Sequence, residues 1–119
     1  MVNAALNKFI QQDNAMRAMF AQTILEDEFL EMLKTEPLLF NETLALAGER
    51  NWAHPRDLAI KMNMSESNTR KWFKTSQDQR STPKFPMMRQ ALLELASIVN
   101  APGLPRRTSM GAELEAQFI

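Results

Sequence analysis

The fold of this chain is organised around residues 55–74, which have the sequence PRDLAIKMNMSESNTRKWFK. The spacing of the apolar residues predicts two short helices joined by a three-residue turn, the pattern of a helix-turn-helix. Leu58, Ala59 and Met62 share the inner face of the first helix, where the small Ala59 lets a second helix cross closely. We expect Met64 to fill the corner between the two helices.

The predicted second helix, residues 65–75, has two chemically different faces. Ser65 is a residue type that caps helix N-termini, so we expect it to begin this helix rather than to contact a ligand. At about 100° per residue, Thr69, Trp72 and Phe73 lie on the inner side. The opposite side carries Ser67, Arg70, Lys71 and Lys74. Three positive charges therefore project together.

This outer face suits the major groove of DNA, because donors on a helix reach the base edges while the flanks meet phosphate. Arg70 can bind O6 and N7 of guanine in a bidentate manner, and Glu66 can accept a hydrogen bond from N4 of cytosine. Lys71 and Lys74 suit phosphate or guanine. The predicted DNA-binding residues are Glu66, Ser67, Asn68, Arg70, Lys71 and Lys74, followed by Arg80 and Lys84 in the next loop.

The composition limits the class of protein. The 119 residues suffice for about one domain, and no apolar run approaches the roughly 18 residues that cross a bilayer. The first residues, MVNAALNKF, lack the pattern of a secretory signal. The absence of cysteine excludes disulfides and thiolate metal sites, and no cofactor is predicted. We therefore expect a soluble, cytoplasmic protein without a membrane segment.

Charge is divided along the chain although the formal net charge is zero. Residues 1–49 hold three basic and eight acidic side chains, whereas residues 50–107 hold eleven basic and four acidic ones. Residues 108–119 add two acidic side chains. Local potential governs contact with phosphate, so this division favours a polyanion facing the middle segment. Chance clustering on solvated faces is the alternative interpretation.

The remaining sequence predicts an all-α fold, because signals for strands and hairpin turns are nearly absent. Helices are expected over residues 4–12, 15–34, 37–47 and 86–100. Asp13 or Asn14 is expected to cap the second of these, and Gly48 to end the third. The 37–47 helix should bury Leu38, Leu39, Leu44, and Leu46 or Ala47, and the 86–100 helix Met88, Ala91, Leu92, Leu95, Ile98 and Val99.

The predicted architecture is a compact helical bundle that contains the helix-turn-helix and has extra N-terminal helices. We divide the chain into an N-terminal extension (1–36), a DNA-binding domain (37–100) and a C-terminal tail (101–119). The 15–34 helix is apolar over more than one stripe, so it buries two sides. The second side would face another copy of the chain or a protein partner, or the helix would be central to a monomeric bundle.

Residues 58–67, with the sequence LAIKMNMSES, and the later pair Trp72 and Phe73 resemble the helix-turn-helix of the bacteriophage lambda repressor and Cro superfamily. The resemblance covers about residues 38–100 and implies a compact all-α domain that binds a near-palindromic operator as a dimer. By position, it assigns base reading to Glu66, Ser67, Arg70 and Lys71, and the cap of the first motif helix to the region of His54 and Pro55.

Three positions differ from the usual residues of that family. Asn63 stands where glycine is common, and asparagine tolerates the left-handed conformation better than most residues. Thr69 replaces an apolar β-branched residue, so its hydroxyl needs a partner. Pro55 replaces a polar residue that often contacts phosphate.

The leading hypothesis is a non-enzymatic transcriptional regulator of phage or bacterial type that binds double-stranded DNA as a homodimer. One alternative is a protein-binding module of the same shape, such as an antirepressor or adaptor that uses the N-terminal helices. Another is an accessory protein of phage DNA packaging or replication. Catalysis by the lone His54 is disfavoured, because the sequence offers it no partner nucleophile or carboxylate pattern.

Overall fold

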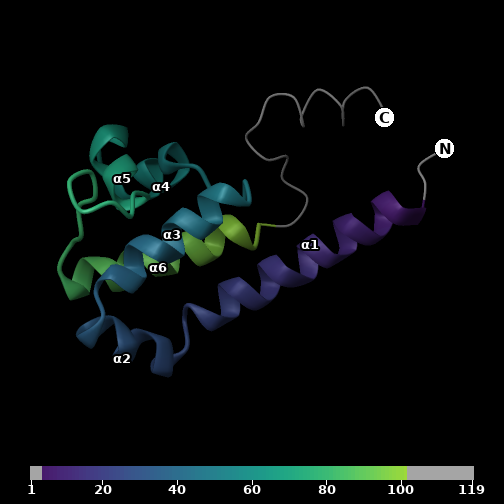
Figure 1. Cartoon of the computed structure of the whole chain (residues 1–119), viewed down its shortest axis with the longest axis horizontal. Coiled ribbons are helices and arrows are strands. Elements are labelled where there is room, and N and C mark those ends of the chain that lie inside the picture. Colours follow the sequence, from purple (N-terminus) through teal and green to yellow (C-terminus); the bar gives the residue numbers. More distant parts are fainter. Residues whose placement is uncertain (1–3, 102–119) are drawn as a thin grey trace.

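The computed structural model describes residues 4–101, and all regular secondary structure in that range is α-helical (Figure 1). The helices are α1 (Ala4–Thr23), α2 (Asp27–Thr35), α3 (Leu38–Glu49), α4 (Pro55–Met62), α5 (Glu66–Trp72) and α6 (Phe85–Val99). The all-α prediction is confirmed for these residues. The predicted C-terminal tail lies outside the described residues apart from Ala101.

The α6 helix is the centre of the core, since it contacts α1, α2, α3 and α4. All six of its side chains that were expected to be inside are buried: Met88, Ala91, Leu92, Leu95, Ile98 and Val99. The helix begins at Phe85, one residue earlier than predicted. Phe40 and Leu44 of α3 and Leu58 of α4 are fully buried in the same core.

The predicted break near Asp13 and Asn14 is wrong, because α1 continues to Thr23. Neither residue is a helix breaker, and Asp13 lies within the helix, where its partly exposed carboxylate accepts a hydrogen bond from Nε1 of Trp52 (2.8 Å). The chain instead turns at residues 24–26. There the N–H groups of Leu25 and Glu26 each bond the carbonyl three residues back, which tightens and ends the helix.

The α1 helix is only partly covered by the rest of the protein. Figure 1 shows its C-terminal half beside the body of the molecule and its N-terminal half projecting beyond it. Ala21 and Ile24, together with Leu33 of α2, belong to the common core. The division of the chain into an N-terminal extension (1–36) and a DNA-binding domain (37–100) stays a prediction. The extension nevertheless contributes buried side chains to the core that it shares with residues 37–100.

The α3 helix does not end at Gly48, contrary to the sequence prediction. It runs to Glu49, and the chain then reverses through Asn51, whose φ of 59° is left-handed. Gly48 has a packing role: a Cβ there would lie 3.3 Å from Cδ2 of Phe73, so glycine lets the end of α5 approach. Leu38 and Leu46 are exposed, whereas Ala47 is fully buried.

Candidate nucleic-acid interface on α4 and α5

The start of α4 is held by its flanking residues. Nδ1 of His54 accepts a hydrogen bond from the backbone N–H of Arg56 (3.0 Å), and the carboxylate of Asp57 accepts one from the N–H of His54 (3.3 Å). Pro55 occupies the first turn, where its missing N–H costs nothing. The predicted capping position of His54 is confirmed.

The turn between α4 and α5 is built as the sequence predicts. Asn63 is left-handed (φ 56°, ψ 50°), and the N–H of Met64 bonds the carbonyl of Ala59 (2.9 Å). Oγ of Ser65 accepts a hydrogen bond from the N–H of Asn68 (3.2 Å), which confirms Ser65 as the cap of α5.

The inner face of α5 is buried as expected. Thr69 is fully buried, and its hydroxyl donates to the carbonyl of Ser65 (2.9 Å), which supplies the partner that the hydroxyl requires. The ring of Trp72 packs edge-on against Phe40 of α3, with 5.6 Å between the centroids. The angular position of α5 on the body is therefore set by close packing.

Asn41 of α3 makes a buried polar connection to α5 that the sequence analysis missed. Its Nδ2 donates to the carbonyls of Trp72 (3.1 Å) and Ser81 (2.9 Å), and its Oδ1 accepts from the hydroxyl of Thr82 (2.7 Å). The side chain is fully buried. It satisfies a carbonyl at the end of α5 and ties the following loop to the core. The only sequence signal was a polar residue within an apolar helix.

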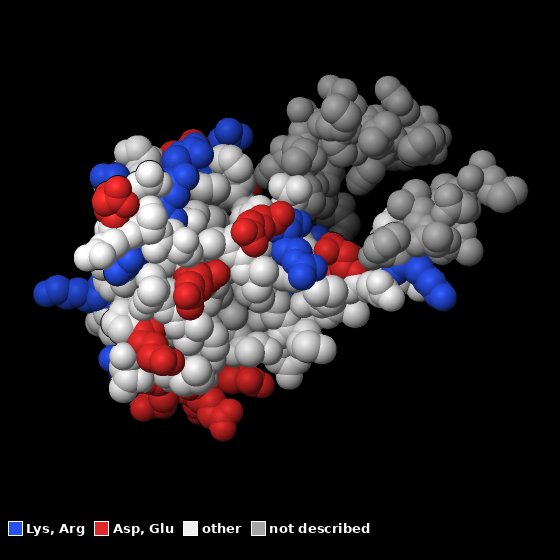
Figure 2. Space-filling view, in the orientation of Figure 1, with Lys and Arg blue, Asp and Glu red and all other residues white. Residues whose placement is uncertain are grey.

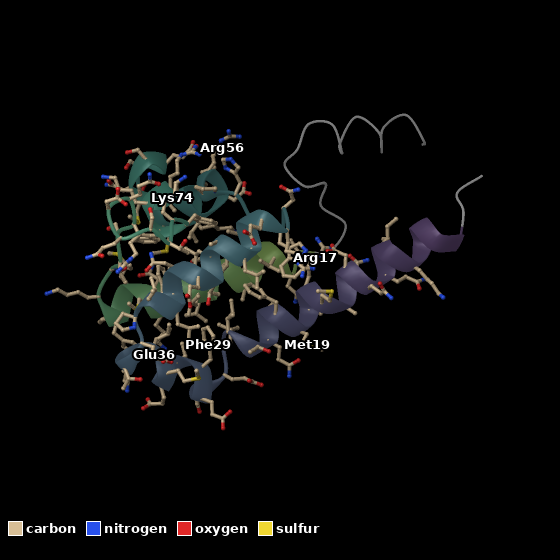
Figure 3. The ribbon with its side chains drawn as sticks, in the orientation of Figure 1. Arg17, Met19, Phe29, Glu36, Arg56 and Lys74 are labelled. Carbon is tan, nitrogen blue, oxygen red and sulfur yellow. The ribbon has the colours of Figure 1, made fainter. Side chains whose placement is uncertain are left out.

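The outer face of α5 reaches solvent where the sequence predicted it. Ser67, Asn68, Arg70, Lys71 and Lys74 are exposed, and Glu66 is half-buried. Figure 3 shows Lys74 and Arg56 at the upper side of the body, and Glu36 and Phe29 of the α2 region at its lower side. The α5 helix ends at Trp72, three residues earlier than predicted, so Lys74 lies just beyond it. The exposed residues of α5 and Lys74 form one surface, which we call the α5 face.

Arg56 of α4 also belongs to the α5 face, although the sequence analysis did not name it. Its Nε lies 3.6 Å from Oε1 of Glu66, and Oε2 of Glu66 accepts a hydrogen bond from Nη2 of Arg70. Glu66 therefore lies between two guanidinium groups from different helices. Glu66 stands four residues before Arg70 on the same helix, and this spacing was a sequence signal for the pair of Glu66 and Arg70. The pair of Glu66 and Arg56 had no such signal.

The loop between α5 and α6 returns to the end of α5. The N–H of Ser81 bonds the carbonyl of Lys71 (3.1 Å), and the half-buried Arg80 donates through Nη1 to the carbonyl of Thr75 (3.3 Å). An open hollow between this loop and the helices is lined by Met64, Asn68, Lys71, Trp72, Asp78, Gln79, Arg80, Ser81, Pro83 and Met87. Of the two predicted DNA-binding residues in this loop, Arg80 therefore lines the same hollow as Lys71. The other, Lys84, is exposed and lies directly before α6.

Charge on the folded surface follows the division seen in the sequence. Residues 54–89 hold eight basic and three acidic side chains, and residues 26–36 hold one basic and five acidic. Figure 2 shows a group of acidic side chains at the lower edge, over α2, and several basic side chains with a few acidic ones over the α4 and α5 end. The α2 region is therefore mainly acidic, and the α4 and α5 region is mainly basic.

Within residues 4–101, no three side chains of His, Cys, Asp or Glu gather as a metal site would require. A search of the same residues for a helix with the length and hydropathy of a membrane span found none. Comparison of the chain with protein-family models, with curated proteins and with solved structures found no match.

Proposed function

We propose that this protein is a transcriptional regulator of phage or bacterial type that acts in the cytoplasm, without catalysis, by binding double-stranded DNA as a homodimer. The α4 and α5 helices would serve as its helix-turn-helix, with α5 in the major groove. The resemblance to the lambda repressor and Cro superfamily over residues 38–100 supports the same assignment.

The observation that carries the proposal is the division of α5 into a buried and a basic exposed face. Thr69 and Trp72 are buried, while Arg70 and Lys71, with Lys74 just beyond the helix, reach solvent. A helix presented in this way offers guanidinium and ammonium donors to base edges and phosphates. Arg80 and Lys84 extend the contact toward the DNA backbone.

Selection from random duplexes followed by mobility shift tests the proposal. The full chain should enrich a sequence, and Arg70→Ala should cost about 1–3 kcal/mol and relax one operator position. Lys74→Ala should weaken all sequences alike, because it removes a phosphate contact. Absence of a sequence preference, with binding unchanged when Arg70 and Lys71 are both replaced by alanine, would refute the proposal.

A second candidate function is protein binding through the N-terminal helices. Large apolar side chains of α1 and α2, and of the turn between them, are exposed: Ile10, Met16, Met19, Leu25 and Met32. An apolar surface of this kind suits an adaptor or antirepressor that engages another regulator.

The dependence on salt separates the two functions. Binding to DNA should fall steeply as salt is raised, since several phosphate contacts release counterions together. Association through apolar helices should change little over the same range. A binding event that survives high salt would favour the second candidate.

A further inference from the structure

The carboxylate of Glu66 contacts basic side chains of both α4 and α5. It is within 3.6 Å of Nε of Arg56 and is hydrogen-bonded to Arg70. Arg56 belongs to α4 and Arg70 to α5, so one carboxylate pairs with a cation from each of these two helices. In the described part of the chain, Lys71 and Lys74 form no ion pair, so these cations remain available to an anion.

The exposure of the three paired groups makes the pairing reversible. The side chains are 62%, 35% and 49% exposed for Arg56, Glu66 and Arg70. Ion pairs with this much exposure are weak, because water screens them and long side chains lose freedom in forming them. A bidentate contact with O6 and N7 of guanine is directional and exists only at a matching base pair, whereas a phosphate attracts a guanidinium in every sequence.

We propose that Glu66 is a positioning residue that competes with DNA for Arg56 and Arg70. With both arginines held, the protein offers fewer cations to the backbone of a non-matching sequence. A matching guanine draws Arg70 away from Glu66, so the competition reduces binding to wrong sequences more than to the right one. This inference rests on the proposed function and concerns how the same face discriminates between sequences.

The proposal gives Glu66 a different role from the one that the sequence suggested. As a reader of cytosine, Glu66 would stabilise the specific complex, and its loss would weaken binding to the matching sequence. As a competitor, it lowers attraction to all phosphate backbones, and its loss strengthens binding to random sequences. The two roles therefore predict opposite changes when the carboxylate is neutralised.

The test compares Glu66→Gln with Asp78→Asn in the full chain. Both substitutions remove one negative charge with little change of shape. Asp78 is a matched control because it lies in the loop of the same basic region, beside the hollow that Lys71 and Arg80 line, and forms no ion pair within residues 4–101. Dissociation constants are measured on a random-sequence duplex and on the duplex that selection enriches, across a series of salt concentrations.

Glu66→Gln should tighten binding to the random duplex about 5- to 10-fold, and Asp78→Asn by about 2-fold at most. Binding to the selected duplex should tighten no more than about 2-fold in either variant, so only Glu66→Gln lowers the preference for that sequence. The salt dependence on random DNA should steepen in Glu66→Gln by about one phosphate contact for each released arginine. Adding Arg70→Ala should remove about half of the gain, because Arg56 remains released.

Three results would overturn the competitor role. Equal effects of Glu66→Gln and Asp78→Asn would mean that only net charge matters. A loss of affinity confined to one base pair of the selected duplex would make Glu66 a base reader. A lower melting temperature with unchanged DNA binding would make it a brace between α4 and α5.

Failure of the proposed function is distinguishable from failure of this inference. If neither the wild-type chain nor Glu66→Gln binds any duplex at about 50 mM salt, the DNA-binding function is refuted and the competitor role with it. If the wild-type chain prefers one sequence and Glu66→Gln keeps the same preference, the DNA-binding function stands and only the competitor role is refuted.

Discussion

The α4–α5 end of the protein and its α1–α2 end are both made of helices, but different interactions hold them in place. The α4 and α5 helices have eight and seven residues, too few to be stable alone. Their positions depend on caps, on the left-handed Asn63 and on the buried amide of Asn41. The α1 helix has twenty residues and is anchored along one half by apolar packing and by the bond between Asp13 and Trp52.

The surfaces of the two ends differ accordingly. The α5 face presents polar and basic side chains on a backbone held by directional bonds, which is the requirement for reading a fixed pattern of donors and acceptors. The α1 and α2 helices present acidic side chains and exposed apolar ones such as Met19, which suit a less directional association. If the proposed function holds, this difference predicts two kinds of partner, one for each end.

The largest effect expected is at the connection between α3 and the end of α5. Asn41→Ala removes three hydrogen bonds and leaves the buried carbonyl of Trp72 and the carbonyl of Ser81 without this donor, so the free energy of unfolding should fall by about 3 kcal/mol. Urea denaturation measures it. Glu42→Ala, at an exposed neighbouring position, should change stability by less than about 0.5 kcal/mol. A loss below about 1 kcal/mol in Asn41→Ala would show that packing alone places α5.

At the other end, Asp13→Ala tests how α1 is anchored. It removes the carboxylate that accepts from Nε1 of Trp52 and pairs with Arg17, and the expected loss is about 1.5 kcal/mol. Hydrogen exchange should quicken in α1 and stay unchanged in α4 and α5. Gln12→Ala, which alters an exposed position one residue earlier, is the control. Uniformly faster exchange in all helices would mean that the two ends unfold as one unit.

A smaller effect is expected in the turn between α4 and α5. Asn63→Ala should lower stability by about 1 kcal/mol, because alanine is strained at a φ of 56°. Asn63→Gly should leave stability unchanged within about 0.5 kcal/mol, since glycine adopts this conformation freely. Thermal unfolding of the pair gives the difference directly. Equal stability of the two variants would contradict a strained turn.

The smallest effect on stability is expected on the exposed side chains of α1. Ile10→Gln combined with Met19→Gln should change the free energy of unfolding by less than about 0.5 kcal/mol, because both side chains are exposed. If the exposed apolar side of α1 faces another copy of the chain, the mass in solution should fall to that of a monomer. Light scattering measures the mass. An unchanged dimer would place the interface elsewhere.

Several features of the candidate site were predictable because their interactions are local. The caps at His54 and Ser65 and the turn at Asn63 join residues at most five positions apart. The burial of Thr69 and Trp72 follows from helical periodicity within a single helix. The sequence by itself therefore determined the all-α class and the local shape of α4, α5 and the turn between them.

Only the tertiary structure decided the features that join distant parts of the chain. The partners of Asn41 are 31 to 41 residues away, and Trp52 is 39 residues from Asp13. The glycine at position 48 makes room for the ring of Phe73 and does not end a helix. Spacing along the chain carries information only about neighbours on the same helix, so contacts of this kind become visible once the helices are packed.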